Sequence, residues 1–280
     1  MNLGFVGNGN VVLISAGDRV YTDIAARFCR SEKSLEDIIG TPYDKKIVEN
    51  ILNAGHLAAT EFDYFIFGVE GYSRVTETQL VRKRMASYLI KSGRVEKHGK
   101  RSFDVVLPST DIATKYFSDY VLINDGFSRL YTEESGEYKP LQIDKPVYIR
   151  TNAIPILNII ESWYNNAVAE GAKEEEARYL KPQATEFKAV IGMNAEALIQ
   201  WFRIRCCQNA QTEIRDLATK MLKLAKEAKP DLFVKAGASC VALGYCPENK
   251  FQNSKCKGKV PTHDEVLQML RERKNVIQNG

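Results

Sequence analysis

The chain has 280 residues, of which 39 are Lys or Arg and 35 are Asp or Glu, so its formal net charge at pH 7 is +4. This length is enough to bury a full hydrophobic core in one domain, with or without a short extension. The shares of hydrophobic and charged residues, 44% and 26%, are ordinary for a soluble globular protein. The mild positive charge suits an anionic small molecule as well as nucleic acid, and it favours neither.

Two features bear on where the protein works. No apolar run reaches the length of a membrane span, and residues 1–20 lack the basic start, apolar core and cleavage site of a secretory signal. Six cysteines fit a reducing compartment better than a disulfide scaffold. We therefore expect a cytoplasmic protein that does not enter a membrane. The chain has three histidines, a scarcity that argues against a histidine-based metal or triad enzyme.

The chain begins with glycines at positions 4, 7 and 9, followed by an apolar run. Their spacing is not that of a dinucleotide-binding loop, and they precede the apolar run instead of following a strand. We predict a first strand over Val11–Ser15 and a helix over Asp23–Cys29, with three residues of that helix facing inward: Ala25, Ala26 and Phe28.

A second helix is predicted after Thr41. Thr41 is placed to cap it, Pro42 to take the first helical position, and Asp44 to complete a near capping box. Gly55 is placed to end it. Its apolar residues recur at helical spacing and predict a buried stripe of Ile47, Val48, Ile51 and Leu52.

An aromatic and β-branched run over Phe62–Val69 has the length and composition of a strand. It brings Glu61 to one end and Gly71–Arg74 to the other. His56 precedes it and has two interpretations. It is a ligand or base in a site, or a histidine at a helix end or on the surface, and the residues alone leave both open.

The stretch Thr76–Arg94 concentrates groups that bind anions. Three cations, Arg82-Lys83-Arg84, follow a helix-compatible run, and Ser92-Gly93-Arg94 forms a turn further on. Arginine forks suit phosphates and the edges of heteroaromatic rings, and a serine beside a glycine lets backbone N–H groups approach an anion. A basic run is also typical of a solvated face, so the pattern alone does not establish a site.

Further strands and helices are predicted in the second half. Phe103–Leu107 and Thr185–Ile191 read as strands, and residues 109–150 read as an insertion with a small helical piece and a hairpin. Asn152–Glu170 reads as an amphipathic helix, ended by Gly171, with these residues inward: Ile156, Leu157, Ile160, Trp163 and Tyr164.

A single long helix is predicted over Asn194–Leu222, after a break at Gly192. An arginine on its inner face needs an anion or acceptor, because a buried unpaired charge is costly. The alternative is that this arginine reaches the surface or pairs with an acid. Residues three or four positions apart share that face: Asn194, Leu198, Trp201, Arg205 and Asn209.

The last part of the chain carries three cysteines, Cys240, Cys246 and Cys256. They allow zinc binding with His263 as a fourth ligand, but paired Cys-x-x-Cys spacing is missing, so inert thiols remain the alternative. Thr262 and Glu265 are spaced as a capping box for a closing helix whose inward residues are Val266, Met269 and Leu270.

Several of these segments together resemble one family, the flavin-dependent thymidylate synthases. Its signature reads Arg-His-Arg, then seven residues, Ser, and Arg two positions further on, and Arg82-Lys83-Arg84 with Ser92 and Arg94 is similar to it. Further similar segments occur in the family's order along residues 11–220: Ala25–Cys29, Gly55-His56, Ser73-Arg74, Gln79–Val81, Ala177-Arg178 and Ala210–Arg215.

This resemblance implies an α+β fold with helices around a curved, largely antiparallel sheet, to which we assign Val11–Ser15, Phe62–Val69, Phe103–Leu107 and Thr185–Ile191. It implies a domain over 1–225 with an insertion at about 109–150, and a C-terminal extension over 226–280. It also implies FAD as cofactor, methylation of dUMP at C5 to dTMP, methylenetetrahydrofolate and NADPH as co-substrates, and a homotetramer whose chains share sites.

The resemblance assigns roles to individual residues. Arg205 and Ser92 are the catalytic candidates, Arg205 by polarising the pyrimidine carbonyl. The nucleotide would be bound by Gln79, Arg82, Ser92, Gly93, Arg94, Arg178 and Arg205. The flavin would be bound by His56, Glu61, Arg82, Lys83, Arg84, Met85, Asn194, Glu196 and Asn209.

The chain departs from the family at several of these positions. Lys83 and Asn209 stand where the family has histidine, Glu196 where it has arginine, and Ile90 where many members have glutamate; Leu89 replaces asparagine and Phe62 replaces histidine. One alternative is therefore a divergent member that acts on another pyrimidine nucleotide or transfers another one-carbon group. Another is a nucleic-acid-binding module using the basic runs, which is disfavoured because acids balance the chain and aromatics are not interleaved with the cations.

Overall fold

The computed structural model describes residues 3–91, 103–108, 118–122, 131–134, 137–140 and 148–278. Contacts within the chain divide it into two compact units. The first consists of Met1–Phe5 and Ser92–Thr185, and the second of Val6–Lys91 and Glu186–Gly280. The domain boundary expected at 225/226 stays a prediction, and it falls inside one helix, α9 (Thr212–Ala228).

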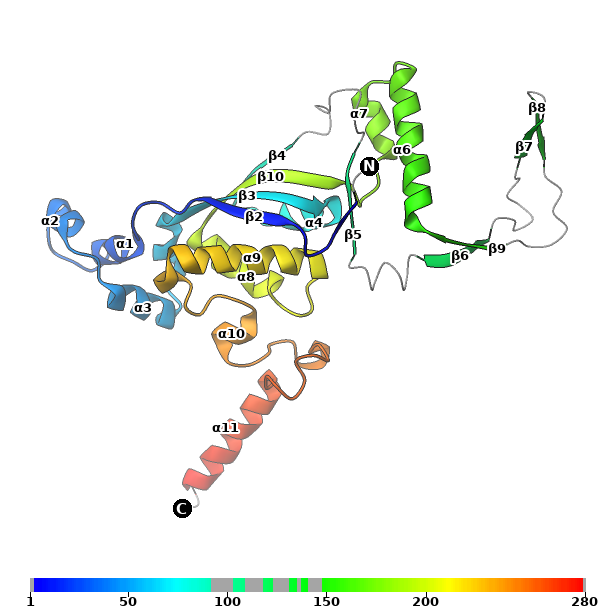
Figure 1. Cartoon of the computed structure of the whole chain (residues 1–280). Coiled ribbons are helices and arrows are strands. Elements are labelled where there is room, and N and C mark those ends of the chain that lie inside the picture. Colours follow the sequence, from blue (N-terminus) through cyan, green and yellow to red (C-terminus); the bar gives the residue numbers. More distant parts are fainter. Residues whose placement is uncertain are drawn as a thin grey trace. The chain divides into compact units, whose positions relative to one another are not determined.

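A four-stranded antiparallel sheet forms the centre of the second unit (Figure 1). Its strands lie in the order β2 (Asn10–Ser15), β3 (Tyr64–Ser73), β10 (Glu186–Asn194) and β4 (Ser87–Ile90), and each neighbour runs antiparallel. The α+β class and the antiparallel sheet predicted from the sequence are confirmed. Three of the four predicted strands, those beginning near 11, 62 and 185, are in this sheet.

The fourth predicted strand is present, but it does not belong to this sheet. The run at 103–107 forms β5 (Val105–Leu107), which pairs in parallel with β1 (Leu3–Phe5) inside the first unit. The strand that completes the sheet is β4, in the middle of the basic stretch, where Ile90 pairs with Ala189. It has four residues, which alternate between exposed and half-buried, and a run this short does not by itself identify a strand.

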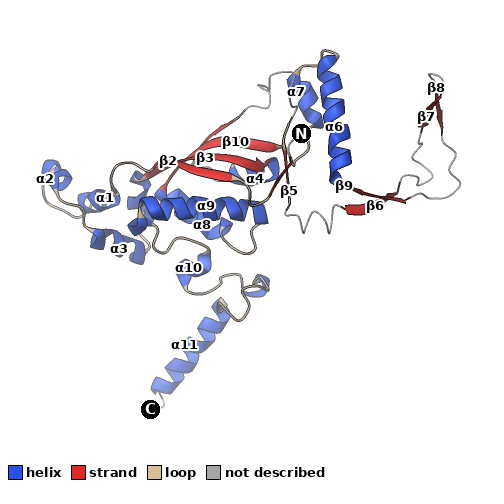
Figure 2. Ribbon diagram, viewed as in Figure 1, coloured by secondary structure: helices blue, strands red, loops and turns tan. Residues whose placement is uncertain are grey.

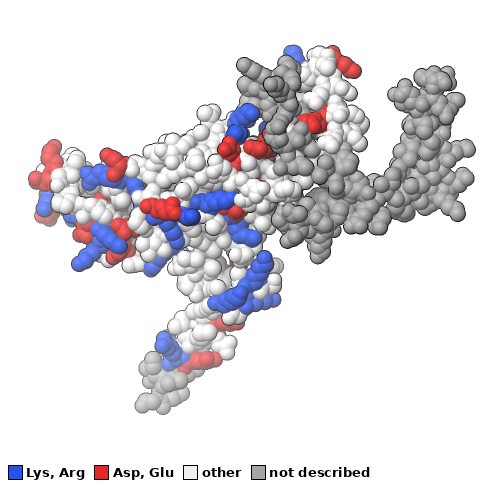
Figure 3. Space-filling model, in the orientation of Figure 1, with Lys and Arg blue, Asp and Glu red and all other residues white. Residues whose placement is uncertain are grey.

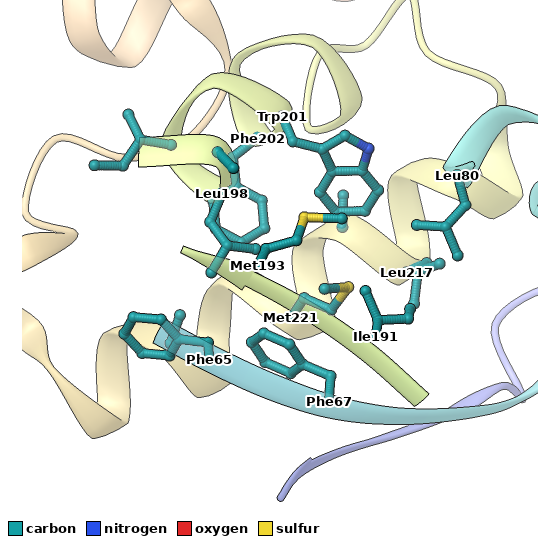
Figure 4. Packing of buried hydrophobic residues seen from close by; sticks show 14 of the residues in the cluster. Phe65, Phe67, Leu80, Ile191, Met193, Leu198, Trp201, Phe202, Leu217 and Met221 are labelled. Atoms are coloured by element: carbon teal, nitrogen blue, oxygen red, sulfur yellow. The ribbon is translucent and has the colours of Figure 1, made fainter. Parts of the chain in front are cut away.

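One face of this sheet is covered by two helices, α8 (Ala195–Arg205) and α9, as Figure 2 shows. Alternate residues of β3 and β10 point into this layer, because successive side chains of a strand face opposite sides. The resulting core is close-packed, and the side chains labelled in Figure 4 include Phe65, Phe67, Leu80, Ile191, Met193, Leu198, Trp201, Phe202, Leu217 and Met221.

The single long helix predicted over Asn194–Leu222 is wrong, because the chain breaks it into α8 and α9. Gln211 caps α9, its side-chain oxygen accepting from the backbone N–H groups of Glu213 and Ile214, each at 3.0 Å. The side-chain oxygen of Gln211 takes the place of the backbone carbonyls that would accept these bonds in a continuous helix, so a new helix begins here. The break predicted at Gly192 is also wrong, since Gly192 lies inside β10, where a Cβ would come within 2.4 Å of the Tyr64 hydroxyl.

Two buried carboxylates tie the elements of this unit together. Asp63 accepts from the backbone N–H groups of Tyr21 and Thr22 and from the ammonium group of Lys229, which lies 2.9 Å away. Glu213 accepts from the backbone N–H of Ser73 at 2.6 Å and from its hydroxyl at 2.5 Å. Buried charges need such partners, and here every contact links segments far apart in sequence.

Before β3, the second unit has three short helices, α1 (Thr22–Phe28), α2 (Leu35–Gly40) and α3 (Lys45–Ala54), and a 3₁₀ turn, η1 (Leu57–Phe62). The helix predicted after Thr41 is confirmed, but its cap is Asp44, whose carboxylate accepts from the backbone N–H of Lys46. Thr41 instead follows the end of α2. Gly55 ends α3 in the left-handed conformation as predicted, whereas Phe28 is exposed.

The first unit contains α6 (Ala153–Ala169), α7 (Glu174–Ala177) and η2 (Arg178–Leu180). In the predicted insertion, β6 (Ser118–Leu122) pairs with β9 (Tyr148–Asn152), and β7 (Tyr131–Glu134) forms a hairpin with β8 (Glu137–Pro140). Every described element of that insertion is a strand, so the helical piece falls outside the described residues.

A separate core lies in this unit, formed by Phe103, Val105, Leu107, Leu157, Tyr164 and Ala177. The helix predicted over Asn152–Glu170 is confirmed by α6. Two of its predicted inward residues are not buried, since Ile156 is 48% and Trp163 is 61% exposed.

The chain ends with η3 (Pro230–Leu232), α10 (Ser239–Leu243), η4 (Asn249–Phe251) and α11 (His263–Gln278). The predicted capping box of α11 is confirmed by reciprocal bonds between Thr262 and Glu265. Met269 and Leu270, predicted inward, are more than half exposed. Among the helices of the described residues, none is long and apolar enough to cross a membrane.

Candidate functional site

The basic stretch forms a tight turn between α4 (Arg74–Leu80) and β4. The hydroxyl of Tyr88 donates to the carbonyls of Leu80 and Lys83, each at 2.9 Å, and so holds the start of the turn against the sheet. Burial raises the pKa of Tyr88 to about 12, so the hydroxyl keeps its proton for these bonds. Arg82 and Arg84 are left exposed at the surface.

The structure brings together two residues predicted to bind the nucleotide. The guanidinium of Arg205, at the end of α8, donates to the side-chain oxygen of Gln79 at 3.3 Å and to its backbone carbonyl at 3.2 Å. Both acceptors are neutral, and burial lowers the pKa of Arg205. A half-buried arginine held by neutral oxygens keeps its charge available for an anionic or carbonyl group of a ligand.

A second group of predicted residues forms a chain of polar contacts of its own. The ammonium of Lys83 donates to the Gln200 side-chain oxygen at 2.9 Å, and the Gln200 amide donates to Glu196 at 2.9 Å. Glu196 is also hydrogen-bonded to Glu61. The four side chains come from η1, the turn after α4, and α8, so three separate segments meet here.

The electrostatics of this group depend on the close approach of two carboxyls. The pKa of Glu196 is raised by burial, by its hydrogen bond to Glu61 and by the Glu61 charge, while Lys83 and Gln200 oppose the shift. Burial lowers the pKa of Lys83, and the charge of Glu196 opposes this change. Burial and a neighbouring negative charge both favour the protonated form of a carboxyl, here Glu196. The group therefore can hold or release a proton.

The remaining predicted residues have different surroundings. Asn194 caps α8, its oxygen accepting from the backbone N–H of Ala197 at 2.8 Å. The amide of Asn209 donates to the Glu248 carboxylate at 2.9 Å and to the Phe251 carbonyl at 2.8 Å, so the C-terminal segment already engages it.

Four predicted residues are not located in the site by the structure. Ser92, Gly93 and Arg94 lie outside the described residues. Arg178 begins η2 in the first unit, whereas Gln79 and Arg205 belong to the second.

The sequence analysis missed a cavity of about 780 Å³ among α1, α2, α3 and η1, although it singled out His56, which lines it. Three basic residues, Arg27, Arg30 and Lys33, also line this cavity, together with apolar residues that include Ile38 and Ile51. The spacing of the three cations at every third residue was the available signal. In the structure, Arg27 also contacts Asp23 and Asp44.

Comparisons with known proteins agree on one family. A sequence model of the family described as "Thymidylate synthase complementing protein" matches residues 13–231. A flavin-dependent thymidylate synthase of Geobacter sulfurreducens is 32% identical over 252 residues, which cover 89% of this chain and 91% of that protein. Another, from Clostridium tetani, is 33% identical over 235 residues and covers 80% and 84%.

A solved structure has the same fold. It is the crystal structure of a UMP/dUMP methylase, PolB from Streptomyces cacaoi, bound with 5-Br dUMP. The likeness has a TM-score of 0.60 at 18% identity and covers 85% of this chain and 98% of that chain. The family match over most of the chain, with the relatives above, leads to one conclusion: the chain belongs to the flavin-dependent thymidylate synthase family.

Proposed function

We propose that the protein methylates dUMP at C5 to give dTMP, with FAD as cofactor, methylenetetrahydrofolate as one-carbon donor and NADPH as reductant. The observation that carries this proposal is the Arg205–Gln79 pair, in a member of this family that also brings Glu61 and Glu196 together. The names of the relatives and the dUMP methylase title of the solved structure support the same substrate.

The exposed residues of the turn between α4 and β4 fit a flavin. Arg82 and Arg84 carry fixed charges that suit a pyrophosphate, and Met85, 66% exposed, offers a polarisable apolar surface to a ring. A bound flavin supplies the redox chemistry, and the protein binds, orients and polarises. The flavin side is completed, in this proposal, by His56, Glu61, Lys83, Asn194, Glu196 and Asn209.

The nucleotide side centres on Arg205. Its charge, held next to Gln79, is suited to polarise a pyrimidine carbonyl and to stabilise negative charge that develops on the ring. In this proposal Arg94, with Ser92 and Gly93, holds the phosphate from a neighbouring subunit, and Arg82 and Arg178 contact the rest of the nucleotide.

The exposed face of the sheet supports a homotetramer, as the family implies. Val12 is 49%, Leu89 76% and Val190 41% exposed on the face away from α8 and α9, around a hollow of about 450 Å³. Contiguous apolar patches of this kind are typical of protein interfaces. A stable monomer in sedimentation at working concentrations would count against sites shared between chains. We also keep a reducing cytoplasm as our proposal, because all six cysteines are free.

The central test is a change at Arg94. Each charge-assisted contact to phosphate contributes roughly 1.5–3 kcal/mol, so Arg94→Ala should weaken dUMP binding by about one to two decades. Flavin binding should stay nearly intact. Arg84→Ala is the matched control, because it removes an arginine assigned to the flavin side. Calorimetric titration with dUMP and FAD separates the two effects, and loss of FAD binding in Arg94→Ala would contradict the assignment.

A divergent member of the family is the second candidate, favoured by Glu196 and by Ile90, which is half-buried in β4 and has no charge to offer a nucleotide. Titration with dUMP, dCMP and dTMP, followed by tritium release from C5-labelled dUMP with folate and NADPH, decides between them. Binding of dUMP with tritium release supports thymidylate synthesis. Binding of another pyrimidine nucleotide without tritium release supports the divergent member. If no nucleotide binds while flavin is present, the protein shares only the fold of the family.

A further inference from the structure

Five of the six cysteines line one cavity of about 650 Å³ in the second unit. They come from segments far apart in the sequence. Cys206 and Cys207 follow the end of α8, Cys240 belongs to α10, and Cys246 and Cys256 lie in the loop between α10 and α11. The sixth, Cys29, lies outside this cavity on an exposed position after α1. Convergence of thiols from three segments on one cavity requires an explanation.

Four of the five thiols form the inner group. Cys206 packs against the main hydrophobic core and belongs to that core instead. The other four, Cys207, Cys240, Cys246 and Cys256, line the cavity from the end of α8, from α10 and from the loop before α11.

The segment that carries these cysteines has little core of its own. Across residues 238–262, all of which are described, Gln252 is the one buried residue. Val241 and Phe251, which an ordinary core would cover, are 54% and 80% exposed. Segments this poor in buried apolar surface are commonly stabilised by a metal or by disulfides, and the cysteines here are free.

We propose that Cys207, Cys240, Cys246 and Cys256 bind one Zn²⁺ ion at this cavity. Four thiolates give the closed tetrahedral coordination of a structural zinc site, which leaves no position open for catalysis. Each thiol loses its proton as the metal binds, and the metal–thiolate bonds replace the missing core as the link between α8 and the C-terminal segment.

The surroundings favour such a centre electrostatically. Zinc with four thiolates keeps a net negative charge, which nearby cations offset. Lys226 lines the cavity, and the loop itself contains Lys250, Lys255, Lys257 and Lys259. Figure 3 shows basic side chains gathered over the loop that precedes α11. His263, considered from the sequence as a fourth ligand, is engaged elsewhere, with its ring 5.3 Å from that of Tyr245.

The four thiols must draw closer together for the metal to bind. Within the described part of the chain, no three His, Cys, Asp or Glu side chains are already spaced as metal ligands. The loop is joined to its surroundings at Cys246, Glu248, Phe251 and Asn253. Cys246 is held by backbone bonds to Pro261 and His263, and Asn253 by one bond to the Gln208 carbonyl. The 240–256 segment closes onto Cys207 when zinc binds.

Zinc binding at this place would also support the candidate site. The same loop supplies Glu248 and Phe251, which hold Asn209, and the cavity is lined by Arg205 at the end of α8. The metal itself does not depend on the proposed activity, and a zinc site is testable whether or not the protein methylates dUMP.

The first measurement is the metal content of the full-length protein, purified without chelators from zinc-supplemented medium. Inductively coupled plasma mass spectrometry should find about one zinc per chain. Serine replacements at Cys207, Cys240, Cys246 or Cys256 should lower zinc retention at least tenfold after dialysis against a weak chelator. Cys206→Ser and Cys29→Ser are the matched controls and should retain it.

A second measurement needs no variant, and so remains valid if a serine replacement fails to fold. Cobalt titrated into the chelated wild-type chain under reducing conditions should give the strong near-ultraviolet bands of several thiolate–metal bonds, and zinc should displace them. Substoichiometric zinc together with the absence of these bands would overturn the proposal. Zinc retained in Cys240→Ser/Cys246→Ser would also overturn it, as would stoichiometric iron and sulfide in place of zinc.

Discussion

Two carboxylates two positions apart in the chain have opposite surroundings. Asp63 is completely buried and is satisfied by Lys229 and by the backbone at the start of α1. Glu61 is exposed and contacts another carboxyl, that of Glu196. The first arrangement stabilises the fold at the expense of any ligand binding, because no part of the carboxylate is free. The second stabilises little by itself and leaves charge to be used by a bound molecule.

The same contrast separates two regions of the second unit. The interior is the hydrophobic core with its buried carboxylates Asp63 and Glu213. The rim consists of the candidate-site residues Glu61, Gln79, Lys83, Glu196, Gln200 and Arg205. In the interior, Glu213 accepts two bonds from Ser73, and the surrounding side chains are apolar. At the rim, Arg205 donates to two neutral oxygens of Gln79, and Lys83 is linked to Glu196 through Gln200. The comparison predicts that substitutions inside alter stability most, while substitutions at the rim alter binding most.

The largest expected effect is at Asp63. Asp63→Ala removes the partner of a buried ammonium group and three hydrogen bonds, and breaking a buried ion pair costs about 3–5 kcal/mol. Urea unfolding followed by circular dichroism measures the loss. Glu61→Ala is the matched control from the same segment and should change the unfolding free energy by about 0.5 kcal/mol or less. Equal losses in the two variants would remove the distinction between interior and rim.

A smaller loss of stability is expected at Glu213. Glu213→Gln keeps the shape but replaces one acceptor oxygen by an amide donor, which faces the Ser73 hydroxyl or backbone N–H. Weakened hydrogen bonding of a buried group costs about 1–3 kcal/mol. If the hydroxyl of Ser73 reverses and accepts from the new amide, part of the loss is recovered. The double variant Glu213→Gln/Ser73→Ala isolates that part, because alanine has no hydroxyl to reverse.

The interior shows what could be predicted of the fold. Val11–Ser15 and the strand after Phe62 were predictable because alternating or aromatic runs are bounded by turns, and local pattern is enough there. The break between α8 and α9 was not, because Leu, Ala and Lys favour helix on both sides and Gln211 interrupts it through a side-chain cap. The position of β4 depends on pairing with β10, which lies about a hundred residues away in the sequence and leaves no local pattern.

The rim shows what could be predicted of the site. Gln79 and Arg205 were both assigned to the nucleotide by resemblance, and the structure brings them together. That Glu196 contacts Glu61 was not predicted, since α8 and η1 meet only in the folded chain. In the sequence, Lys83 and Glu196 are two separate departures from the family. In the structure they belong to one connected group, in which a lysine and a glutamate replace the family's histidine and arginine.

The first rim prediction concerns Arg205. Arg205→Ala removes a charge-assisted contact worth roughly 1.5–3 kcal/mol and should weaken dUMP binding by about one to two decades. Arg205→Lys keeps the charge but not the planar fork, so it should recover part of the affinity. Calorimetric titration with dUMP measures both, and the urea midpoint should stay close to that of the wild type. A loss of stability as large as that of Asp63→Ala would place Arg205 with the interior instead.

The smallest effect, and the most specific, is the pH dependence of stability at Glu196. Its pKa is raised above the ordinary value of about 4.5 in the folded chain, so the folded state holds a proton that the unfolded state has lost. This contribution is fully present below the unfolded pKa and is lost as pH rises through the folded pKa. Glu196→Gln stays neutral throughout. It should therefore match the wild type in acid and be slightly more stable at pH 7, by about 0.5 kcal/mol or less because the site is solvent-accessible.

The charge of Lys83 provides the decisive control for this last effect. Lys83 opposes the shift at Glu196, so Lys83→Met should raise the pKa of Glu196 further and extend its loss of stability to higher pH. In the Glu196→Gln background the same replacement should produce no such pH-dependent change, because no carboxyl remains at position 196 to respond. Urea midpoints of the four proteins across pH 4 to 8 complete this double-mutant cycle. A pH-independent difference between them would mean that Lys83 and Glu196 act separately, and that the charge of Lys83 does not influence the titration of Glu196.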